Sequence, residues 1–251
     1  MPRAKVGHPF GLIASRLNQR DIMTSDHAEN DRGAGPCQMP NGTGAAPVVG
    51  GAAPLRESPC FTPGTLIATQ RGEIPAEMLR VGDRVVTRDN GIQDVRWVGK
   101  SRMFVQDFQA NPHLLPVLLR QGSLGKGLPE RDLLISPNHR VLVANTRTSL
   151  AFSDAEVLVA AKHLRAEGIQ TIDSSGTTYL HFMFDRHEVI LSNGAWTESF
   201  QPDDQTLKGI GNGQRLEILE LFPSLKSDEG RKAYPPARRV LSAVEGGAVI
   251  N

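Results

Sequence analysis

Residues 60–69 read Cys-Phe-Thr-Pro-Gly-Thr-Leu-Ile-Ala-Thr, a lone cysteine followed by a turn and a short strand. Pro63 and Gly64 are turn formers, and the apolar and β-branched residues up to Thr69 predict the first β-strand of a domain. A thiol at the first residue of a folded domain can attack the carbonyl carbon of the peptide bond that precedes it, here the Pro59-Cys60 bond. The stretch therefore predicts the start of a β domain and a candidate nucleophile in the same place.

The chain before this stretch has a composition that disfavours folding. From Gly33 to Pro54, Gly, Pro and Ala account for 15 of 22 residues. Such a segment has too few large side chains to offset the entropy cost of ordering its backbone. We therefore expect residues 1–57 to be a disordered leader.

Downstream of Cys60, short strands separated by turn residues predict an all-β domain. The clearest signal is Asn90-Gly91, a dipeptide typical of two-residue hairpin turns, between the segments 83–88 and 92–99. We expect a hairpin there, with Trp97 on its second strand.

A second turn presents two polar side chains between strands. The apolar segments 133–135 and 140–143 flank the sequence Ser-Pro-Asn-His at 136–139. This pattern predicts two strand segments that meet at a turn carrying Ser136 and His139.

The last part of the chain is predicted to change from strands to helices. Segments 179–184 and 188–191 are predicted strands on either side of Asp-Arg-His at 185–187. The chain is more polar from residue 205 onward, and we expect helices at 214–222 and 229–245. Residues 203–251 are therefore expected to be a partly helical tail.

Composition argues against several classes of partner. The 28 basic and 27 acidic side chains leave a formal net charge of +1, which gives no electrostatic basis for binding nucleic acid or an anionic membrane. The longest apolar run, 114–119, is far too short to span a membrane. Two cysteines, Cys37 and Cys60, are too few for a disulfide scaffold. The sequence has no CxxC pair, so nothing in it indicates a structural zinc site. We expect no metal and no cofactor.

The N-terminus lacks the apolar core of a secretory signal. We therefore expect a soluble protein, monomeric, that is either cytoplasmic or exported by a route without a standard signal peptide.

Four motifs follow one another along the chain: Cys-Phe-Thr-Pro-Gly-Thr at 60–65, Gly-Asp at 82–83, Ser-Pro-Asn-His at 136–139, and His-Glu-Val-Ile-Leu-Ser-Asn-Gly at 187–194 followed by Thr-Glu-Ser at 197–199. Together they resemble the Hint (hedgehog/intein) superfamily, with the closest likeness to bacterial stand-alone Hint-domain proteins. The resemblance covers residues 58–202. It implies a horseshoe of short antiparallel strands with pseudo-two-fold symmetry, in which Cys60 lies centrally beside the two histidine-bearing motifs.

The resemblance implies self-processing by an N-S acyl shift at the Pro59-Cys60 bond. A thiol attacks well only as thiolate, and expelling the α-amine of Cys60 needs a proton donor near that nitrogen. His139 is the candidate donor, because the corresponding family motif reads Thr-x-x-His and its histidine contacts the scissile amide; Ser136 keeps the hydroxyl of the first position. The product is a thioester that water or another, unidentified nucleophile cleaves, so the leader is the substrate in cis.

Three further residues are candidates with weaker support. His187 opens the last motif and is a candidate catalytic residue. Many inteins carry an aspartate or cysteine just after the aromatic residue that matches Tyr179, where this chain has Leu-His, so His181 or Asp185 could replace that group.

The end of the resemblance departs from inteins. Inteins finish with a His-Asn pair, and the asparagine cyclises to release the C-terminal segment. The aligned pair here is Glu198-Ser199, and serine cannot form a succinimide. The sequence therefore predicts cleavage without protein splicing.

Two other classes of function remain open. One is a Hint fold without self-cleavage that acts as a binding or secretion-associated module. Pro59 restricts the backbone before the scissile bond, which could either preset strain or hinder attack. The other is a cysteine hydrolase that acts in trans, although a nucleophile preceded by its own flexible segment fits attack in cis better.

Overall fold

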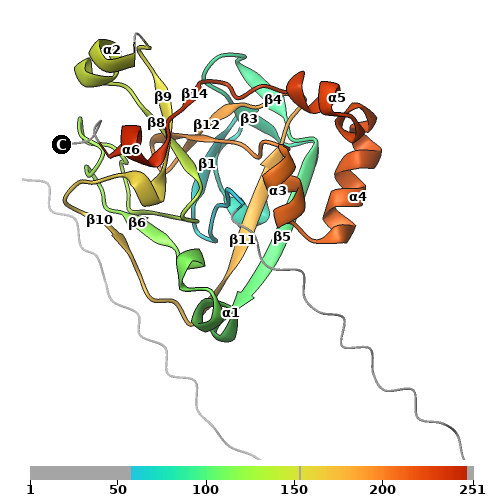
Figure 1. The fold of residues 1–251 in the computed structure, drawn as a ribbon, viewed down its shortest axis with the longest axis horizontal. Helices are drawn as coiled ribbons and strands as arrows, with labels where there is room; N and C mark the ends of the chain where they lie inside the picture. The colour runs from blue at the N-terminus through green and yellow to red at the C-terminus, as the bar shows by residue number, and fades with distance from the viewer. Residues whose placement is uncertain (1–57, 153, 248–251) are drawn as a thin grey trace, which may run out of the picture. The chain divides into compact units, whose positions relative to one another are not determined.

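The computed structural model describes residues 58–152 and 154–247, which are mostly β-strands with short helices (Figure 1). The leader expected at residues 1–57 lies outside the described residues. The all-β class expected from the sequence is confirmed, and most strands are only three or four residues long. The pseudo-two-fold symmetry stays a prediction.

The strands of the described residues, in chain order, are β1 (Leu66–Thr69), β2 (Gly72–Pro75), β3 (Arg84–Val86), β4 (Ile92–Asp94), β5 (Trp97–Phe104), β6 (Val117–Leu119), β7 (Leu133–Ile135), β8 (Arg140–Val143), β9 (Val157–Ala160), β10 (Ile169–Thr171), β11 (Gly176–Met183), β12 (Val189–Ser192), β13 (Ala195–Glu198) and β14 (Arg239–Val240). The helices are α1 (Val105–Ala110), α2 (Thr146–Phe152), α3 (Asp204–Gly209), α4 (Asn212–Leu221), α5 (Asp228–Lys232) and α6 (Ala243–Gly246), with 3-10 helices at Ala76–Met78, Pro112–Leu114, Ala161–His163 and Pro223–Lys226.

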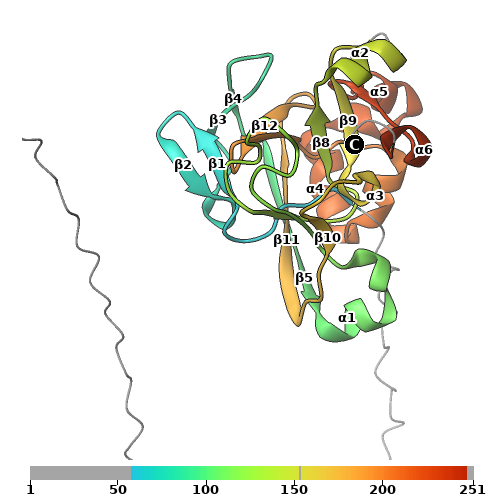
Figure 2. The same cartoon turned by 90° about the vertical axis from the view of Figure 1, so that its left-hand side faces the viewer.

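These strands form three sheets. A nine-stranded sheet runs in the order β14-β9-β8-β13-β12-β1-β3-β4, with β2 paired to β1. A three-stranded sheet has the order β10-β6-β7, and β11 pairs with β5 in a long two-stranded ribbon. Figure 2 shows the β1–β2 and β3–β4 hairpins on one side of β11 and the C-terminal helices on the other.

Phe61 connects the two smaller sheets although it belongs to no regular strand. It forms antiparallel bridges with Ile135 at the end of β7 and with Leu180 in β11. The backbones of Phe61 and Leu180 exchange two hydrogen bonds of 2.9 Å. The start of the domain is therefore fixed between two strands that lie far downstream in the sequence.

The main core lies between the large sheet and the two smaller ones. Strands of all three sheets contribute buried side chains, such as Ile67 of β1, Leu119 of β6 and Phe182 of β11. Phe61 is 1% exposed and packs against Phe182, with ring centroids 5.5 Å apart. This core explains why the apolar positions of such short strands are sufficient to define the fold.

The C-terminal segment packs against the β5–β11 ribbon through a second buried cluster. This segment contributes Leu207, Ile210, Ile218, Leu225 and Tyr234, which surround Trp97, Met183 and Phe200. The Tyr234 hydroxyl also donates a 2.9 Å hydrogen bond to the carbonyl oxygen of Phe184. Residues 204–234 therefore pack against this ribbon (Figure 1).

The Asn90-Gly91 hairpin is present but its second strand is shorter than expected. β3 pairs with β4 around Gly91, whose φ of 66° lies in the left-handed region that glycine tolerates. β4 ends at Asp94, and Trp97 begins β5, which pairs with β11 instead of β3. The chain passes from the large sheet to the β5–β11 ribbon at residues 95–96. The polar and apolar pattern of residues 92–99 does not predict this change of sheet.

The helix expected at 229–245 is wrong as a continuous element. The chain forms α5, then the short strand β14, which pairs in parallel with β9, and then α6. Pro235 and Pro236 explain the break, because proline lacks the backbone N–H of a helix and restricts the residue before it.

A buried ion pair joins β8 to the end of β13. Glu198 is fully buried, and its carboxylate accepts hydrogen bonds from the backbone N–H and the guanidinium of Arg140, at 2.8 and 3.0 Å. Burial alone would raise the pKa of Glu198, but the charge of Arg140 and the hydrogen bond from His187 together hold this pKa below its usual value. The Glu198 carboxylate is therefore charged although it is buried, because Arg140 and His187 stabilise its charged form.

We expect Phe61→Ala to lower the free energy of unfolding by about 3 to 5 kcal/mol, because it removes a buried ring at the point where two sheets meet. Chemical denaturation followed by tryptophan fluorescence measures this change. Phe104→Ala is the control, because Phe104 is 51% exposed, and its effect should stay below about 1 kcal/mol. Equal effects of the two substitutions would contradict this account of Phe61.

We expect Glu198→Gln to destabilise the domain by about 3 kcal/mol near neutral pH, because it leaves Arg140 without its charged partner. The pKa of Glu198 is lowered by folding, so its contribution to stability is complete above the unfolded value of about 4.3 and is lost as pH falls below it. The stability of Glu198→Gln should therefore fall less steeply than that of the wild type below about pH 4. Unfolding measured from pH 3 to 7 tests this, with exposed Glu220→Gln as the control.

Candidate active site

The pairing of Phe61 determines which side chains surround Cys60. In antiparallel pairing the residue before Phe61 lies beside the residues that follow its two partners, Ile135 and Leu180. These residues are Ser136 and His181. The Ser136 N–H accordingly donates a 3.0 Å hydrogen bond to the carbonyl oxygen of Cys60.

Both ends of the Pro59-Cys60 amide are held by side chains. The Cys60 N–H donates to Ser136 Oγ at 2.8 Å, and Ser136 Oγ in turn donates to the Ser58 carbonyl oxygen at 2.9 Å. On the other side, His181 Nδ1 lies 2.9 Å from the Pro59 carbonyl oxygen. A carbonyl oxygen only accepts, so Nδ1 of His181 carries the proton.

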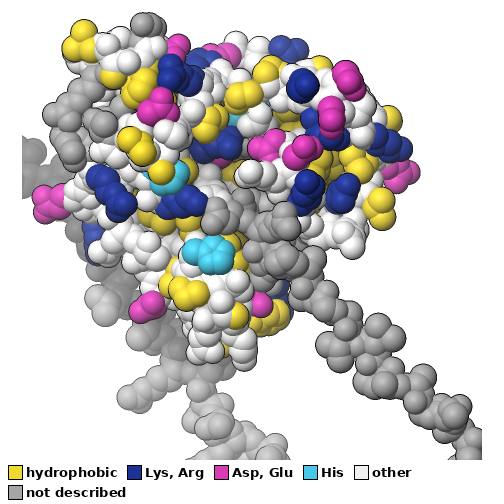
Figure 3. All heavy atoms as spheres, viewed as in Figure 1, with side chains coloured by type: hydrophobic (Ala, Val, Ile, Leu, Met, Phe, Trp, Pro, Cys, Tyr) yellow, Lys and Arg dark blue, Asp and Glu magenta, His cyan; other side chains and the backbone are white. Residues whose placement is uncertain are grey.

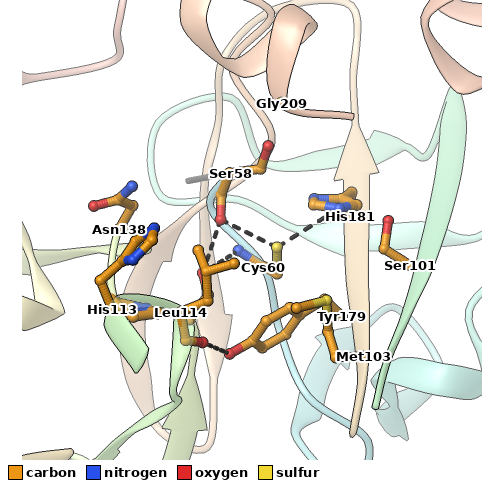
Figure 4. Close-up of a pocket in the computed structure, with 12 residues that line it drawn as sticks. Ser58, Cys60, Ser101, Met103, His113, Leu114, Asn138, Tyr179, His181 and Gly209 are labelled. Atoms are coloured by element: carbon orange, nitrogen blue, oxygen red, sulfur yellow. Dashed lines mark hydrogen bonds between the residues drawn. The ribbon is translucent and has the colours of Figure 1, made fainter. Parts of the chain in front are cut away.

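This tautomer leaves the other nitrogen of His181 free to accept a proton. Its Nε2 lies 3.6 Å from Cys60 Sγ, and the thiol also reaches the Ser58 carbonyl oxygen at 3.1 Å. Figure 4 shows the sulfur between His181 and Ser58. One imidazole thus contacts both atoms that change in an acyl shift, the attacking sulfur and the carbonyl oxygen.

Burial keeps the thiol and the imidazole neutral. Burial raises the pKa of the Cys60 thiol well above its usual value, against the hydrogen bond of Ser136, which lowers it. Burial also lowers the pKa of His181 to about 4, although its hydrogen bond to Pro59 opposes the shift. Near neutral pH the site therefore contains a protonated thiol beside a neutral base.

Aromatic side chains fix the ring of His181. Trp97 stacks on it with an interplanar angle of 25°, and Phe200 meets it edge-on at a centroid distance of 5.4 Å. Gly99 lies opposite His181 in the β5–β11 pairing, and a Cβ at this glycine would come within 2.2 Å of the Trp97 ring. The strand opposite His181 therefore needs glycine to admit the tryptophan.

His139 lies next to the site, and its backbone N–H donates a 3.1 Å hydrogen bond to the Ser136 carbonyl oxygen. Its ring packs edge-on against Phe61 at a centroid distance of 4.3 Å, and neither ring nitrogen has a hydrogen-bond partner among the described residues. Burial lowers the pKa of His139 to about 4. Ser136 Oγ, rather than the His139 ring, accepts the hydrogen bond from the Cys60 N–H.

His187 and Asp185 are placed elsewhere. His187 Nε2 lies 3.3 Å from Glu198 Oε2, and its Nδ1 accepts a 2.9 Å hydrogen bond from the backbone N–H of Ala237. The Asp185 carboxylate is largely exposed and pairs with Arg96 at 3.4 Å. His187 therefore connects the buried Glu198–Arg140 ion pair to the C-terminal segment. Asp185 lies at the surface.

A small cavity of about 30 Å³ borders Cys60. Its lining includes Ser58, Ser136, His181, Tyr179, His113 and Asn138. Figure 4 shows His113 and Asn138 on the side of Cys60 away from His181. The cavity has room for roughly two water molecules, which limits what can reach the sulfur without movement of the protein.

The sequence signal that could have identified His181 more firmly is its spacing from Tyr179. Residues two apart on a strand lie on one face, and both of these side chains line the cavity. Ser58 and His113 also line the cavity, but no pattern in the sequence indicated this.

Three further observations on the described residues bear on what the domain could bind. Residues 58–152 and 154–247 contain no group of three or more His, Cys, Asp or Glu side chains arranged to hold a metal ion. On the described part of the face in Figure 3, acidic and basic side chains are intermixed. None of the described helices combines the length and apolar character needed to cross a lipid bilayer.

The solved structures that match this chain include inteins and an intein-like domain. A bacterial intein-like domain from Clostridium thermocellum is 13% identical, with a TM-score of 0.37, and the match covers 56% of this chain and 97% of that chain. A variant of the Ssp DnaB mini-intein is 13% identical, with a TM-score of 0.40, covering 59% and 99%. A DnaB intein from Synechocystis is 9% identical, with a TM-score of 0.37, covering 57% and 99%.

The comparison with curated proteins found no match. The Hint domain family, in contrast, matches residues 59–204, which is more than half of the sequence and begins one residue before Cys60. The chain therefore belongs to the Hint domain family.

Proposed function

We propose that this Hint domain cleaves its own chain by an N-S acyl shift at the Pro59-Cys60 bond, followed by opening of the thioester by water or another nucleophile. The observation that carries the proposal is that side chains contact both the nitrogen and the carbonyl oxygen of the Pro59-Cys60 amide. Ser136 contacts its nitrogen and His181 contacts its oxygen, while the Cys60 sulfur faces the free nitrogen of His181.

In the first step the thiol attacks the carbonyl carbon of Pro59. His181 Nε2 takes the thiol proton as the C–S bond forms, so the thiolate never exists as a separate buried charge. The carbonyl oxygen gains negative charge at the same time. The Nδ1–H of His181 already points at this oxygen, and the ring has just become positive, so it stabilises the developing oxyanion.

In the second step the C–N bond breaks and the α-amine of Cys60 leaves. The nitrogen needs a proton, and Ser136 Oγ lies 2.8 Å away with a hydroxyl proton that it now donates to the Ser58 carbonyl oxygen. Turning this hydroxyl toward the nitrogen provides the donor that an amide needs to depart. The proton that His181 took from the thiol then returns to Ser136 Oγ through water in the cavity that both side chains line, so both side chains end neutral. Overall, the thiol proton ends on the α-amine, a C–S bond replaces a C–N bond, and cleavage of the thioester separates 1–59 from 60–251.

Splicing is not part of the proposal. Glu198 is held by Arg140 and His187, and the Ser199 hydroxyl accepts a 2.9 Å hydrogen bond from the Glu188 N–H. Neither side chain has the amide nitrogen that succinimide formation needs. The catalytic roles expected for His139 and His187 stay predictions, and the cavity beside Cys60 is too small to favour a cysteine hydrolase that acts on large substrates in trans.

We expect the full chain to release two fragments that separate between residues 59 and 60, faster when dithiothreitol is added, because a thiol opens a thioester directly. Intact-mass spectrometry of protein with a tag at each end measures this over days at pH 6 to 9. Cys60→Ala should stay intact, whereas Cys37→Ala, which retains Cys60, should cleave like the wild type. A wild type that remains as uncleaved as Cys60→Ala would favour the non-catalytic binding module.

We expect His181→Ala to slow dithiothreitol-dependent cleavage by about 100-fold or more, because it removes the base and the oxyanion donor together. Ser136→Ala should slow it by roughly 10-fold to 100-fold, through loss of the hydrogen bond to the leaving nitrogen. The same fragment assay gives these rates. His139→Ala tests the sequence-based role of His139 in parallel. A His181→Ala variant that folds and cleaves at the wild-type rate would rule out the assignment of His181.

A further inference from the structure

The residues that hold the amide do not by themselves account for opening the thioester. His181 is engaged with the Pro59 carbonyl oxygen on the inner side of Cys60. His139 is not among the side chains that line the cavity beside the sulfur. A base for an incoming nucleophile is therefore expected on the opposite side of this cavity.

His113 occupies that opposite side. It lies in the 3-10 helix Pro112–Leu114, is exposed, and lines the cavity together with Cys60 (Figure 4). The buried hydroxyl of Tyr179 donates a 2.7 Å hydrogen bond to the Leu114 carbonyl oxygen, which ties this helix to β11 two residues before His181. The position of His113 relative to the site is therefore set by the same strand that carries His181.

The cavity is suited to water. Its volume of about 30 Å³ admits water directly, whereas a larger nucleophile such as dithiothreitol reaches the thioester only when the protein moves. Ser58 is 7% exposed and lines the cavity, and its hydroxyl has no hydrogen-bond partner among the described residues. A buried hydroxyl without a protein partner is a typical contact for an ordered water.

We propose that the acceptor is water and that His113 is the base that activates it. This inference rests on the proposed acyl shift. A water between His113 and the thioester attacks the Pro59 carbonyl carbon and gives one proton to the imidazole. The C–S bond then breaks and Cys60 Sγ receives that proton, so the products are a carboxyl group at Pro59 and a free thiol at Cys60.

The test separates hydrolysis from thioester formation. The full chain is incubated in buffer alone and in buffer with dithiothreitol, and fragment release is followed by intact mass. Dithiothreitol supplies its own nucleophile, so this arm reports formation of the thioester, whereas the buffer arm also needs activated water. The variants are His113→Gln, Tyr179→Phe, and His163→Gln as the control, because His163 is a half-buried histidine of another 3-10 helix that does not line the cavity.

We expect His113→Gln to slow release in buffer by about 100-fold, the usual contribution of a general base, and to leave release with dithiothreitol unchanged. Tyr179→Phe should reduce the buffer arm less strongly, since it loosens the helix but keeps the imidazole. His163→Gln should match the wild type in both arms. Equal rates of wild type and His113→Gln in buffer would overturn the role of His113, as would an equal loss in both arms. Absence of release from the wild type even with dithiothreitol would instead overturn the acyl shift itself.

Discussion

The double pairing of Phe61 is the constraint on which the site depends. Its backbone bridges Ile135 on one side and Leu180 on the other, and its ring fills the core where the sheets meet. Because strand pairing has a two-residue period, a shift of one position would turn Cys60 away from both Ser136 and His181. Stability and chemistry are therefore joined in one residue: the same contacts that bury Phe61 bring the sulfur, the serine and the histidine together.

The electrostatics of the site favour a resting state in which neither the Cys60 thiol nor the His181 imidazole is charged. The thiol and His181 are both neutral because burial disfavours their charged forms. The buried carboxylate of Glu198 would add a negative field near the sulfur, and it raises the pKa of Cys60, but Arg140 neutralises much of its charge. In the proposed acyl shift, charge develops only during the reaction, when the proton moves from sulfur to imidazole and the oxyanion forms beside it.

Local signals predicted much of the fold, because Asn90-Gly91 and the turn at 136–139 act within a few residues. The position of Trp97 was not predictable, because its strand partner, β11, lies about eighty residues away and only tertiary pairing assigns it. The four motifs identified Cys60, Ser136 and His139. They did not indicate that His181 contacts the Pro59 carbonyl oxygen, because that contact depends on strand register rather than on residue type.

The packing of residues 203–247 changes what counts as one domain. The family match ends at 204, yet the side chains that cover Trp97, Met183 and Phe200 come from beyond it. The N–H of Ala237 also satisfies the buried Nδ1 of His187, and β14 extends the large sheet. The stacking surface behind His181 is thus sealed from solvent by a segment that the shared family core does not contain. A graft of this domain onto another protein would have to end after Leu241, not at the family boundary.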